Sequence, residues 1–300
     1  MRAVVTGGAG FIGSHVAEAL LARGDEVHVL DSLATGKREK VPEGARLHVG
    51  DIRSDTERVF ADVRPEVCFH LAAQADVGTS VERPAYDAEV NVWGTLQVLE
   101  AARAHGTDVV FSSTGGAIYG ECDAPADEDA PRRPISPYGI SKLAGEEYLL
   151  GWNRLFDSQH VALRFANVYG PRQEPELEGG VIAIFLDRMA SGEPTRIFGD
   201  GNQTRDFIYV GDIVSGVLAA VGHQGVYNLG TGVETSVKEL HSVCRRVTGD
   251  EREPEYSPAR EGEILRSVVD PSRAERDLGW RAQRSLEDGL RLTWEEVRTP

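Results

Sequence analysis

Short apolar runs alternate with longer amphipathic stretches along the first 170 residues of the chain. The runs are rich in β-branched residues, and they predict strands at Arg2–Thr6, Glu26–Asp31, Arg46–Asp51, Val67–Leu71, Val109–Ser113 and Val161–Phe165, with a further strand at Val226–Leu229. Between them, apolar positions at helical spacing predict helices at Phe11–Arg23, Thr56–Val63, Pro84–Ala104 and Tyr138–Phe156. Strands that alternate with helices need crossover connections, which are almost always right-handed. The pattern therefore predicts an α/β protein with a doubly wound parallel sheet and helices on both faces.

The alternation breaks after Gly170, where the segment Pro171-Arg172-Gln173-Glu174-Pro175 cannot continue a strand. Beyond it the pattern is mixed. It predicts helices at Val181–Ala190, Asp212–Val221, Val237–Val247 and Leu286–Val297, and short strands near Thr195–Phe198 and Phe207–Val210. We interpret residues 1–170 with 205–230 as the main domain, and residues 171–204 with 231–300 as a smaller mixed α/β lobe that binds substrate.

Composition and charge exclude several classes of protein. The chain has 300 residues, with 32 Lys and Arg against 48 Asp and Glu, and its formal net charge is −16. Such an acidic chain lacks the basic face that nucleic-acid binding requires. Its three cysteines are far apart in the sequence, its first residues lack a signal-peptide core, and no apolar run is long enough to span a bilayer. We therefore expect a cytoplasmic protein with no membrane or nucleic-acid partner, and an acidic surface loop at Glu121–Asp129.

A glycine-rich turn joins the first predicted strand to the first predicted helix. Gly8, Gly10 and Gly13 fit the spacing GxGxxG, and Gly7, Gly10 and Gly13 fit GxxGxxG. Either set lets the backbone approach a pyrophosphate at the helix N-terminus, where free N–H groups and the helix dipole attract anions. The strand before the turn and the helix after it are the context that this motif requires. We therefore predict that the main domain is a Rossmann dinucleotide-binding domain.

Acidic residues stand at the ends of the second and third predicted strands. Asp31 is placed to accept hydrogen bonds from the ribose hydroxyls of the adenosine and to repel a 2′-phosphate. The nearest cations, Lys37 and Arg38, lie beyond Gly36. We therefore predict NAD rather than NADP as the cofactor. Asp51 either faces the adenine or caps the following helix.

Tyr138 and Lys142 are four residues apart at the start of a predicted helix, so both side chains lie on one face. A nearby ammonium group lowers the pKa of a phenol, which makes a tyrosine a usable base near neutral pH. Ser112, Ser113 and Thr114 end the fifth predicted strand, at the carboxyl edge where open α/β sheets bind ligands. We expect Thr114, or alternatively Ser113, to hydrogen-bond the reacting hydroxyl of a substrate. Local hydrogen bonds that cap the turn are an alternative role for Ser112.

Together these motifs resemble those of the extended short-chain dehydrogenase/reductases, and the resemblance covers essentially the whole chain. The residues that carry it are the Gly7–Gly13 turn, Asp31, His70-Leu71-Ala72-Ala73, Asn91, Ser112-Ser113-Thr114, Tyr138 with Lys142, Asn167-Val168-Tyr169-Gly170-Pro171-Arg172, Arg205-Asp206-Phe207 and Arg260-Glu261-Gly262-Glu263. Within this family the chain most resembles the isomerases that interconvert UDP-glucose and UDP-galactose. The resemblance implies transient oxidation of the sugar at C4 with tightly held NAD.

The resemblance also implies roles for individual residues. Tyr138 would be the base, Lys142 would hold the nicotinamide ribose, and Thr114 or Ser113 would relay the proton. The implied cofactor-binding residues are Gly7, Gly10, Phe11, Ile12, Gly13, Asp31, Ser32, Asp51, Ile52, Leu71, Ala72, Ala73, Asn91, Ser112, Tyr138 and Lys142. The implied substrate-binding residues are Thr114, Tyr138, Asn167, Arg205, Arg260 and Glu263. The two guanidinium groups would clamp the diphosphate, Glu263 would bind the uridine ribose, and no metal site is expected.

Several features bear on the exact activity. Gly115 and Gly116 stand where related 4,6-dehydratases carry an Asp-Glu pair, which disfavours elimination of water. The resemblance places the small residue Ser267 at the position that limits the sugar pocket, so a UDP-N-acetylhexosamine is an alternative substrate. UDP-glucuronate is another, with Arg172 as the candidate partner of its carboxylate. The alternative from another class is a non-catalytic NAD-sensing protein, which would need no tyrosine–lysine pair.

The helices predicted at Pro84–Ala104 and Tyr138–Phe156 carry more apolar positions than one sheet can cover. By resemblance, we expect them to form the two-fold interface of a homodimer. The expected partners are therefore a UDP-sugar and a second copy of the chain.

Overall fold

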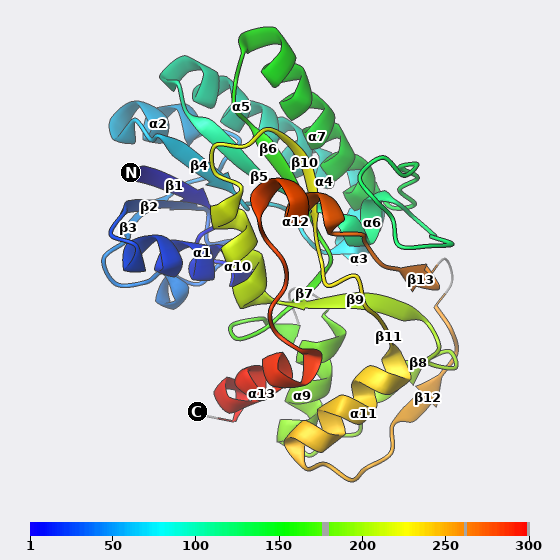
Figure 1. Cartoon of the computed structure of the whole chain (residues 1–300). Helices are drawn as coiled ribbons and strands as arrows, with labels where there is room; N and C mark the ends of the chain where they lie inside the picture. Colours follow the sequence, from blue (N-terminus) through cyan, green and yellow to red (C-terminus); the bar gives the residue numbers. More distant parts are fainter. Residues whose placement is uncertain (176–179, 261–262, 299–300) are drawn as a thin grey trace.

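The computed structural model describes residues 1–175, 180–260 and 263–298 (Figure 1). Its centre is a parallel sheet of seven strands, which are β1 (Arg2–Thr6), β2 (Glu26–Asp31), β3 (Arg46–Val49), β4 (Val67–His70), β5 (Asp108–Thr114), β6 (Val161–Phe165) and β10 (Gly225–Leu229). The strand order is β10-β6-β5-β4-β1-β2-β3, so the direction of winding changes between β1 and β4. The predicted doubly wound fold is confirmed.

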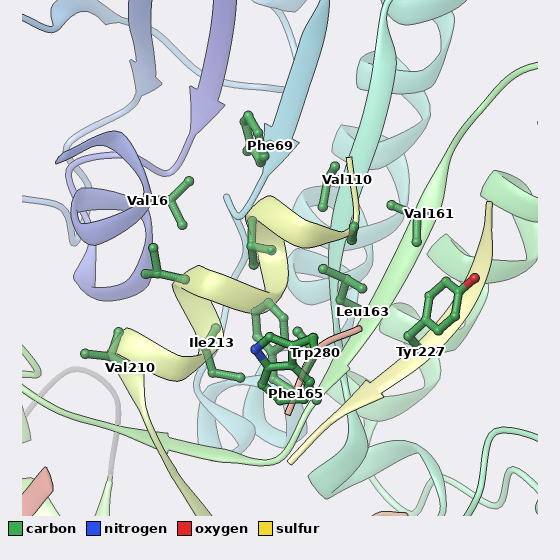
Figure 2. Close-up of a cluster of buried hydrophobic side chains, with 14 of the residues drawn as sticks. Val16, Phe69, Val110, Val161, Leu163, Phe165, Val210, Ile213, Tyr227 and Trp280 are labelled. Carbon is green, nitrogen blue, oxygen red and sulfur yellow. The ribbon is translucent and has the colours of Figure 1, made fainter. Parts of the chain in front are cut away.

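Helices cover both faces of this sheet, and each face encloses an apolar core. The covering helices are α1 (Phe11–Ala22), α2 (Thr56–Val63), α5 (Gly94–His105), α7 (Pro137–Phe156) and α10 (Val210–Ala219). α1 and α10 lie together on one face, where Val16, Ile213 and Leu163 share an apolar cluster with Trp280 (Figure 2). α2, α5 and α7 lie on the other face. The carboxyl ends of the strands are left open between these layers for a ligand.

The helix predicted at Pro84–Ala104 is interrupted in the structure. It consists of α4 (Pro84–Ala88), a π-helical turn η2 (Glu89–Trp93) and α5. Short helices α3 (Val77–Glu82) and α6 (Gly115–Ile118), which were not expected, follow β4 and β5. A π turn inserts one extra residue into a helix and often marks a functional site. Apolar spacing does not reveal such an insertion, and here it contains the buried Asn91.

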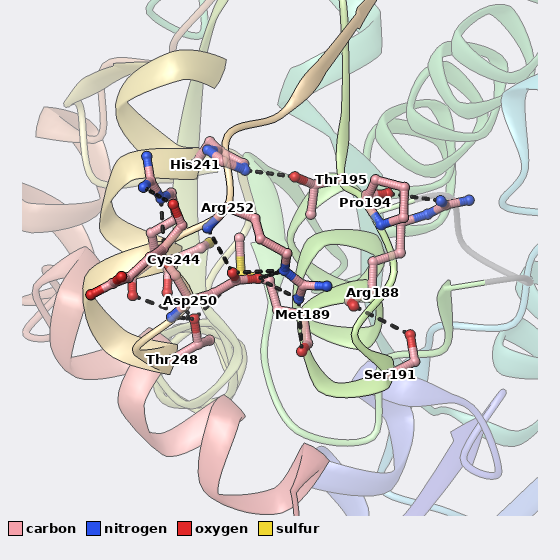
Figure 3. Close-up of polar contacts among 12 residues, drawn as sticks. Arg188, Met189, Ser191, Pro194, Thr195, His241, Cys244, Thr248, Asp250 and Arg252 are labelled. Carbon is pink, nitrogen blue, oxygen red and sulfur yellow. Dashed lines mark hydrogen bonds and ion pairs between the residues drawn. The ribbon is translucent and has the colours of Figure 1, made fainter.

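The smaller lobe combines short strands with helices. Its strands are β7 (Asn167–Tyr169), β8 (Arg196–Phe198), β9 (Thr204–Tyr209), β11 (Glu234–Ser236), β12 (Glu255–Ser257) and β13 (Arg266–Ser267), and its helices are α9 (Val181–Ser191), α11 (Val237–Thr248) and α13 (Leu286–Val297). β9 pairs with β7, β11 and β13, whereas β8 pairs with β12. Thr195 and His241 join the segment before β8 to α11 through a hydrogen bond of 2.7 Å (Figure 3).

The chain passes between the two parts more than once. β9 lies in the small sheet, and α10 and β10 then return to the main sheet. Near the C-terminus, α12 (Ser272–Leu278) packs against β10. The division into residues 1–170 with 205–230 and residues 171–204 with 231–300 stays a prediction.

The acidic segment Glu121–Asp129 is exposed along most of its length, yet it is anchored at specific points. The Glu121 carboxylate accepts a hydrogen bond of 2.7 Å from the N–H of Leu265. The buried Glu128 carboxylate accepts another of 2.7 Å from the N–H of Asn228. Since these partners lie far away in the sequence, local composition could not reveal this anchoring.

Cys68, Cys122 and Cys244 carry free thiols. Among the described residues, no helix combines the length and the apolar character that a bilayer span requires. Nor do these residues bring together three or more His, Cys, Asp or Glu side chains in a way that could hold a metal ion.

Candidate active site

One large cavity lies where the strand order changes, between the main sheet and the smaller lobe. Its volume is about 1030 Å³. Its walls come from the glycine-rich turn, the loops after β2, β3 and β4, the start of α7, and α9, β8 and β9 of the lobe. The predicted site residues that line it are Gly7, Gly10, Phe11, Ile12, Gly13, Asp31, Ser32, Asp51, Ile52, Leu71, Ala72, Ala73, Ser112, Ser113, Tyr138, Lys142, Asn167, Arg205, Arg260 and Glu263. Asn91 and Thr114 are not among the lining residues.

The glycine-rich turn has no room for side chains. Gly7 has a φ of +71°, and a Cβ there would lie 2.7 Å from the backbone nitrogen of Ala72. At Gly13 a Cβ would lie 2.1 Å from the carbonyl oxygen of Gly7. Gly10 is the N-cap of α1, and no side chain caps the first N–H groups of that helix. The residues present therefore fit the pyrophosphate of a dinucleotide.

The backbone around Asp31 fixes its carboxylate at the end of β2. The N–H groups of Ala9 and Leu33 donate hydrogen bonds of 2.9 and 2.8 Å to its two oxygens. Gly36 packs directly against it, since a Cβ there would lie 2.7 Å from Asp31 Oδ1. The loop after β2 thus closes around a carboxylate at the place predicted for the adenosine ribose.

Asp51 lines the cavity and does not cap α2. The N-cap of that helix is Asp55. The Asp51 carboxylate binds the guanidinium of Arg53 at 2.7 Å, and this contact holds the pKa of the Asp51 carboxyl below its usual value. The capping alternative for Asp51 is therefore wrong.

Lys142 is buried on the first turns of α7 beside Tyr138. Ser136 caps this helix, and its Oγ accepts a hydrogen bond of 3.2 Å from the N–H of Gly139. Lys142 Nζ donates to the carbonyl oxygen of Ser112 at 2.8 Å and lies 4.9 Å from the centre of the Phe111 ring. Burial lowers the pKa of Lys142 to about 8. Tyr138 is half-buried and lines the same cavity as Lys142.

The nearby carboxylates oppose this loss of charge at Lys142. Asp87 and Glu146 both raise the pKa of Lys142, although by less than burial lowers it. Glu146 lies one helical turn beyond Lys142, and the buried guanidinium of Arg164 binds it at 2.7 Å. Lys142 therefore lies near two carboxylates, one of which is itself paired with Arg164.

The three hydroxyl residues at the end of β5 have different surroundings. Ser112 Oγ donates to the carbonyl oxygen of His70 at 3.1 Å, so it is held across the sheet rather than by a local turn. Ser113 Oγ is buried without a hydrogen-bond partner and lines the cavity. Thr114 is half-buried, and its Oγ1 would lie 3.9 Å from a Cβ placed at Gly116. Both Ser113 and Thr114 remain candidates for the proton relay.

Asn91 does not line the cavity but holds Gln74, which does. Its Oδ1 accepts a hydrogen bond of 2.9 Å from the N–H of Gln74, and its Nδ2 donates to Asp87 at 2.9 Å and to Ser141 Oγ at 3.3 Å. Gln74 itself lines the cavity. Asn91 therefore joins the loop after β4 to α7 from behind the cavity wall.

The far end of the cavity brings together the residues predicted for the diphosphate and the uridine. The guanidinium of Arg205 lies 3.5 Å from the Glu263 carboxylate, and burial lowers the pKa of Arg205. Arg260 stacks over the Phe198 ring at 4.1 Å. Asn167 lies on the same wall. The motif residues Glu261 and Gly262 lie outside the described residues.

Sequence reasoning missed several lining residues because no motif contains them. Lys40, Gln74, Arg188, Arg196 and Phe198 all line the cavity. The lobe residues among them lie on short elements whose positions depend on tertiary pairing. Their only local signal was that most of them are charged or polar, a property that many surface residues share.

Two residues considered for substrate choice lie away from the cavity wall. Arg172 binds Glu18 at 2.7 Å, and it does not line the cavity. Ser267 is buried in β13 and is not a lining residue either. Neither position supports the alternative substrates directly.

A glycine cradle, an acid at the end of β2 and a buried lysine one turn after a tyrosine define a dinucleotide-dependent enzyme of the short-chain dehydrogenase/reductase type. The model of the NAD dependent epimerase/dehydratase family matches residues 3–230, so the chain belongs to this family. The predicted family and cofactor are confirmed.

Named relatives extend this match over the whole chain. The UDP-glucose 4-epimerase of Mycolicibacterium smegmatis is 44% identical over 99% of both chains. The crystal structure of UDP-glucose 4-epimerase with UDP-glucose from Thermotoga maritima is 46% identical, covers 99% of both chains and has a TM-score of 0.97. The Thermus thermophilus UDP-glucose 4-epimerase in complex with NAD is also 46% identical, covers 100% of this chain and 99% of its own, and has a TM-score of 0.94.

Proposed function

We propose that this protein interconverts UDP-glucose and UDP-galactose as a NAD-dependent 4-epimerase. The observation that carries the proposal is one continuous cavity, with the glycine cradle at one end, Arg205 and Arg260 at the other, and Tyr138 with Lys142 lining it. An oxidation and reduction at one sugar carbon needs both ligands in a single enclosed space. Similarity to named UDP-glucose 4-epimerases along the full chain supports the choice of sugar.

In this reaction, each residue of the site has a separate role. Tyr138 accepts the proton of the sugar 4-hydroxyl and later returns it. The Lys142 ammonium favours the phenolate form of Tyr138 and binds the nicotinamide ribose. Bound NAD supplies the reversible oxidation at C4. Arg205 and Arg260 hold the diphosphate with planar, paired donors, so the sugar can present its other face while the nucleotide stays bound.

The hydroxyl that shares the proton with Tyr138 is either Ser113 or Thr114. Ser113 Oγ is the one with an unmet hydrogen bond on the cavity wall. Replacement by residues of similar size, Ser113→Ala and Thr114→Val, separates the two. The variant that loses at least about tenfold in kcat, with KM unchanged, identifies the relay.

The basic test is proton NMR of the purified protein with UDP-galactose and no added NAD. We expect UDP-glucose to form, because the reaction consumes no cofactor. Tyr138→Phe removes the base and leaves the ring in place, so kcat should fall by about 10² to 10⁴. A Tyr138→Phe protein with near-native kcat would overturn this mechanism.

Parallel reactions with UDP-N-acetylglucosamine and UDP-glucuronate test the alternative substrates. A preference for UDP-glucuronate is not expected, because Arg172, the cation considered for its carboxylate, is bound to Glu18. Binding of NAD without turnover of any nucleotide sugar would instead support a sensing protein.

We further propose that the protein is a homodimer in the cytoplasm. Trp93, Ile140, Tyr148 and Phe156 are large apolar side chains that are exposed on η2 and α7. A second copy that packs the same helices against them would remove this surface from water. The free thiols of all three cysteines are consistent with a reducing compartment.

A further inference from the structure

Two lysines stand beside the adenosine end of the cavity. Lys37 and Lys40 follow the loop that closes around Asp31, and Lys40 lines the same cavity as Asp31. The N–H of Lys37 donates to the carbonyl oxygen of Ala9 at 2.9 Å, which ties the lysine loop to the glycine-rich turn. Cations at this end of a dinucleotide site are the feature that accommodates the 2′-phosphate of NADP. With these two cations nearby, Asp31 alone would not be enough to select NAD over NADP.

Glu174 binds both ammonium groups. Its Oε2 lies 2.8 Å from Lys37 Nζ, and its Oε1 lies 2.5 Å from Lys40 Nζ. The side chain of Lys40 is only 12% exposed and that of Glu174 is 21% exposed, so water screens the Lys40–Glu174 contact less than it screens surface ion pairs, whereas Lys37 is 47% exposed. Burial alone would raise the pKa of the Glu174 carboxyl, but hydrogen bonds from the two lysines hold it below its usual value. The carboxylate is therefore ionised at neutral pH.

The position of Glu174 is set by the junction between the main domain and the lobe. Just before it, the N–H of Arg172 donates to Glu296 Oε1 of α13 at 2.7 Å, and the Arg172 guanidinium binds Glu18 of α1 at 2.7 Å. The carbonyl oxygen of Arg172 accepts a further hydrogen bond of 2.9 Å from Lys40 Nζ. The segment that carries Glu174 is thus held by α1 and α13 as well as by Lys40 itself.

We propose that Glu174 is a cofactor-specificity residue. By occupying Lys37 and Lys40, it denies a 2′-phosphate the two cations that would otherwise bind it, and it adds a second negative charge to that of Asp31. Selection against NADP therefore rests on both lobes of the protein. The proposal concerns the dinucleotide end of the cavity, so its failure would leave the proposed sugar chemistry intact.

The test is a competition between the two dinucleotides for the purified protein. Holoenzyme is incubated with equal concentrations of NAD and NADP until the bound ratio is constant, then desalted, and the released nucleotides are separated by chromatography. Glu174→Gln removes the carboxylate charge from beside both ammonium groups, and the bound NADP:NAD ratio should rise at least about tenfold, the equivalent of one charge-assisted hydrogen bond. Glu174→Asp keeps the charge but shortens its reach, so an intermediate ratio is expected.

Two further variants make the result specific. Glu43→Gln removes one negative charge from an exposed position three residues after Lys40, outside the contacts that hold Glu174, and its ratio should stay at the native value. Glu174→Gln combined with Lys40→Gln should lose most of the gain. A native ratio in both Glu174 variants would overturn the proposal, as would a rise in Glu43→Gln equal to that in Glu174→Gln. Far-UV circular dichroism confirms that each variant is folded.

Discussion

The burial of Lys142 predicts how the free energy of unfolding depends on pH. Its ammonium is buried between α7 and β5, and burial lowers its pKa from 10.5 to about 8. Lys142→Met retains most of the apolar stem and removes the titrating group. The carbonyl oxygen of Ser112 then loses its donor, which costs about 1–3 kcal/mol at every pH.

The sign of the pH dependence follows from proton counting. Below pH 8 the lysine is protonated in both the folded and the unfolded chain, so the full unfavourable effect of burying its charge is present. Between pH 8 and 10.5 the unfolded chain binds one proton more, and the free energy of unfolding rises by up to about 1.4 kcal/mol per pH unit. Over this interval the native protein should therefore gain about 3 kcal/mol relative to Lys142→Met.

Urea unfolding followed by tryptophan fluorescence measures this difference. Both proteins are unfolded at a series of pH values from 7 to about 10.5, with the same cofactor content. Other titrating groups occur in both proteins and cancel in the difference when they lie far from Lys142. If the difference in free energy of unfolding changes by less than about 0.5 kcal/mol over this range, Lys142 is not a buried, charged group and the argument fails.

Other substitutions test the framework around the site. Glu146→Gln leaves the buried Arg164 guanidinium without its counter-charge, so urea unfolding should show a loss of about 3–5 kcal/mol; a loss below about 1 kcal/mol would refute a buried ion pair there. Gly13→Ala places a Cβ against the Gly7 carbonyl oxygen, so the purified protein should lose its bound nucleotide, as the ratio of absorbance at 260 and 280 nm reports. Trp93→Glu puts a charge into the proposed dimer interface, and light scattering should show a monomer; an unchanged mass would argue against that interface.

The main sheet could be predicted because its signal is local. β6 is buried at every position and consists largely of β-branched and apolar residues, so its bounds follow from the sequence alone. β13 is different, because it has two residues and exists through pairing with β9, about 60 residues earlier. The π turn around Asn91 depends in the same way on hydrogen bonds to Gln74 and Asp87.

The residues of the candidate site also differ in whether a local sequence signal or a long-range contact places them. Residues that belong to motifs on the main strands and α7, such as Asp31 and Lys142, line the cavity. Arg188 and Phe198 also line it, but they lie on α9 and β8 of the lobe, whose position over the sheet is set by long-range contacts. For Ser113 and Thr114 the sequence placed both hydroxyls correctly at the end of β5, and only side-chain surroundings distinguish them.

The acidic charge of the chain and the charge of its cavity have opposite signs. The net charge is −16, and a nucleotide sugar and a dinucleotide are both anions, so the field of the whole molecule opposes binding at long range. The charged residues known to line the cavity are seven cations (Lys40, Arg53, Lys142, Arg188, Arg196, Arg205 and Arg260) and four acids (Asp31, Asp51, Asp76 and Glu263). Within a Debye length of about 8–10 Å these nearby cations outweigh distant surface acids, because the solvent screens the latter. Affinity for anions must therefore arise inside the cavity. The roles proposed for Asp31 at the adenosine ribose and Glu263 at the uridine ribose would place these acids against uncharged hydroxyl groups rather than against phosphates.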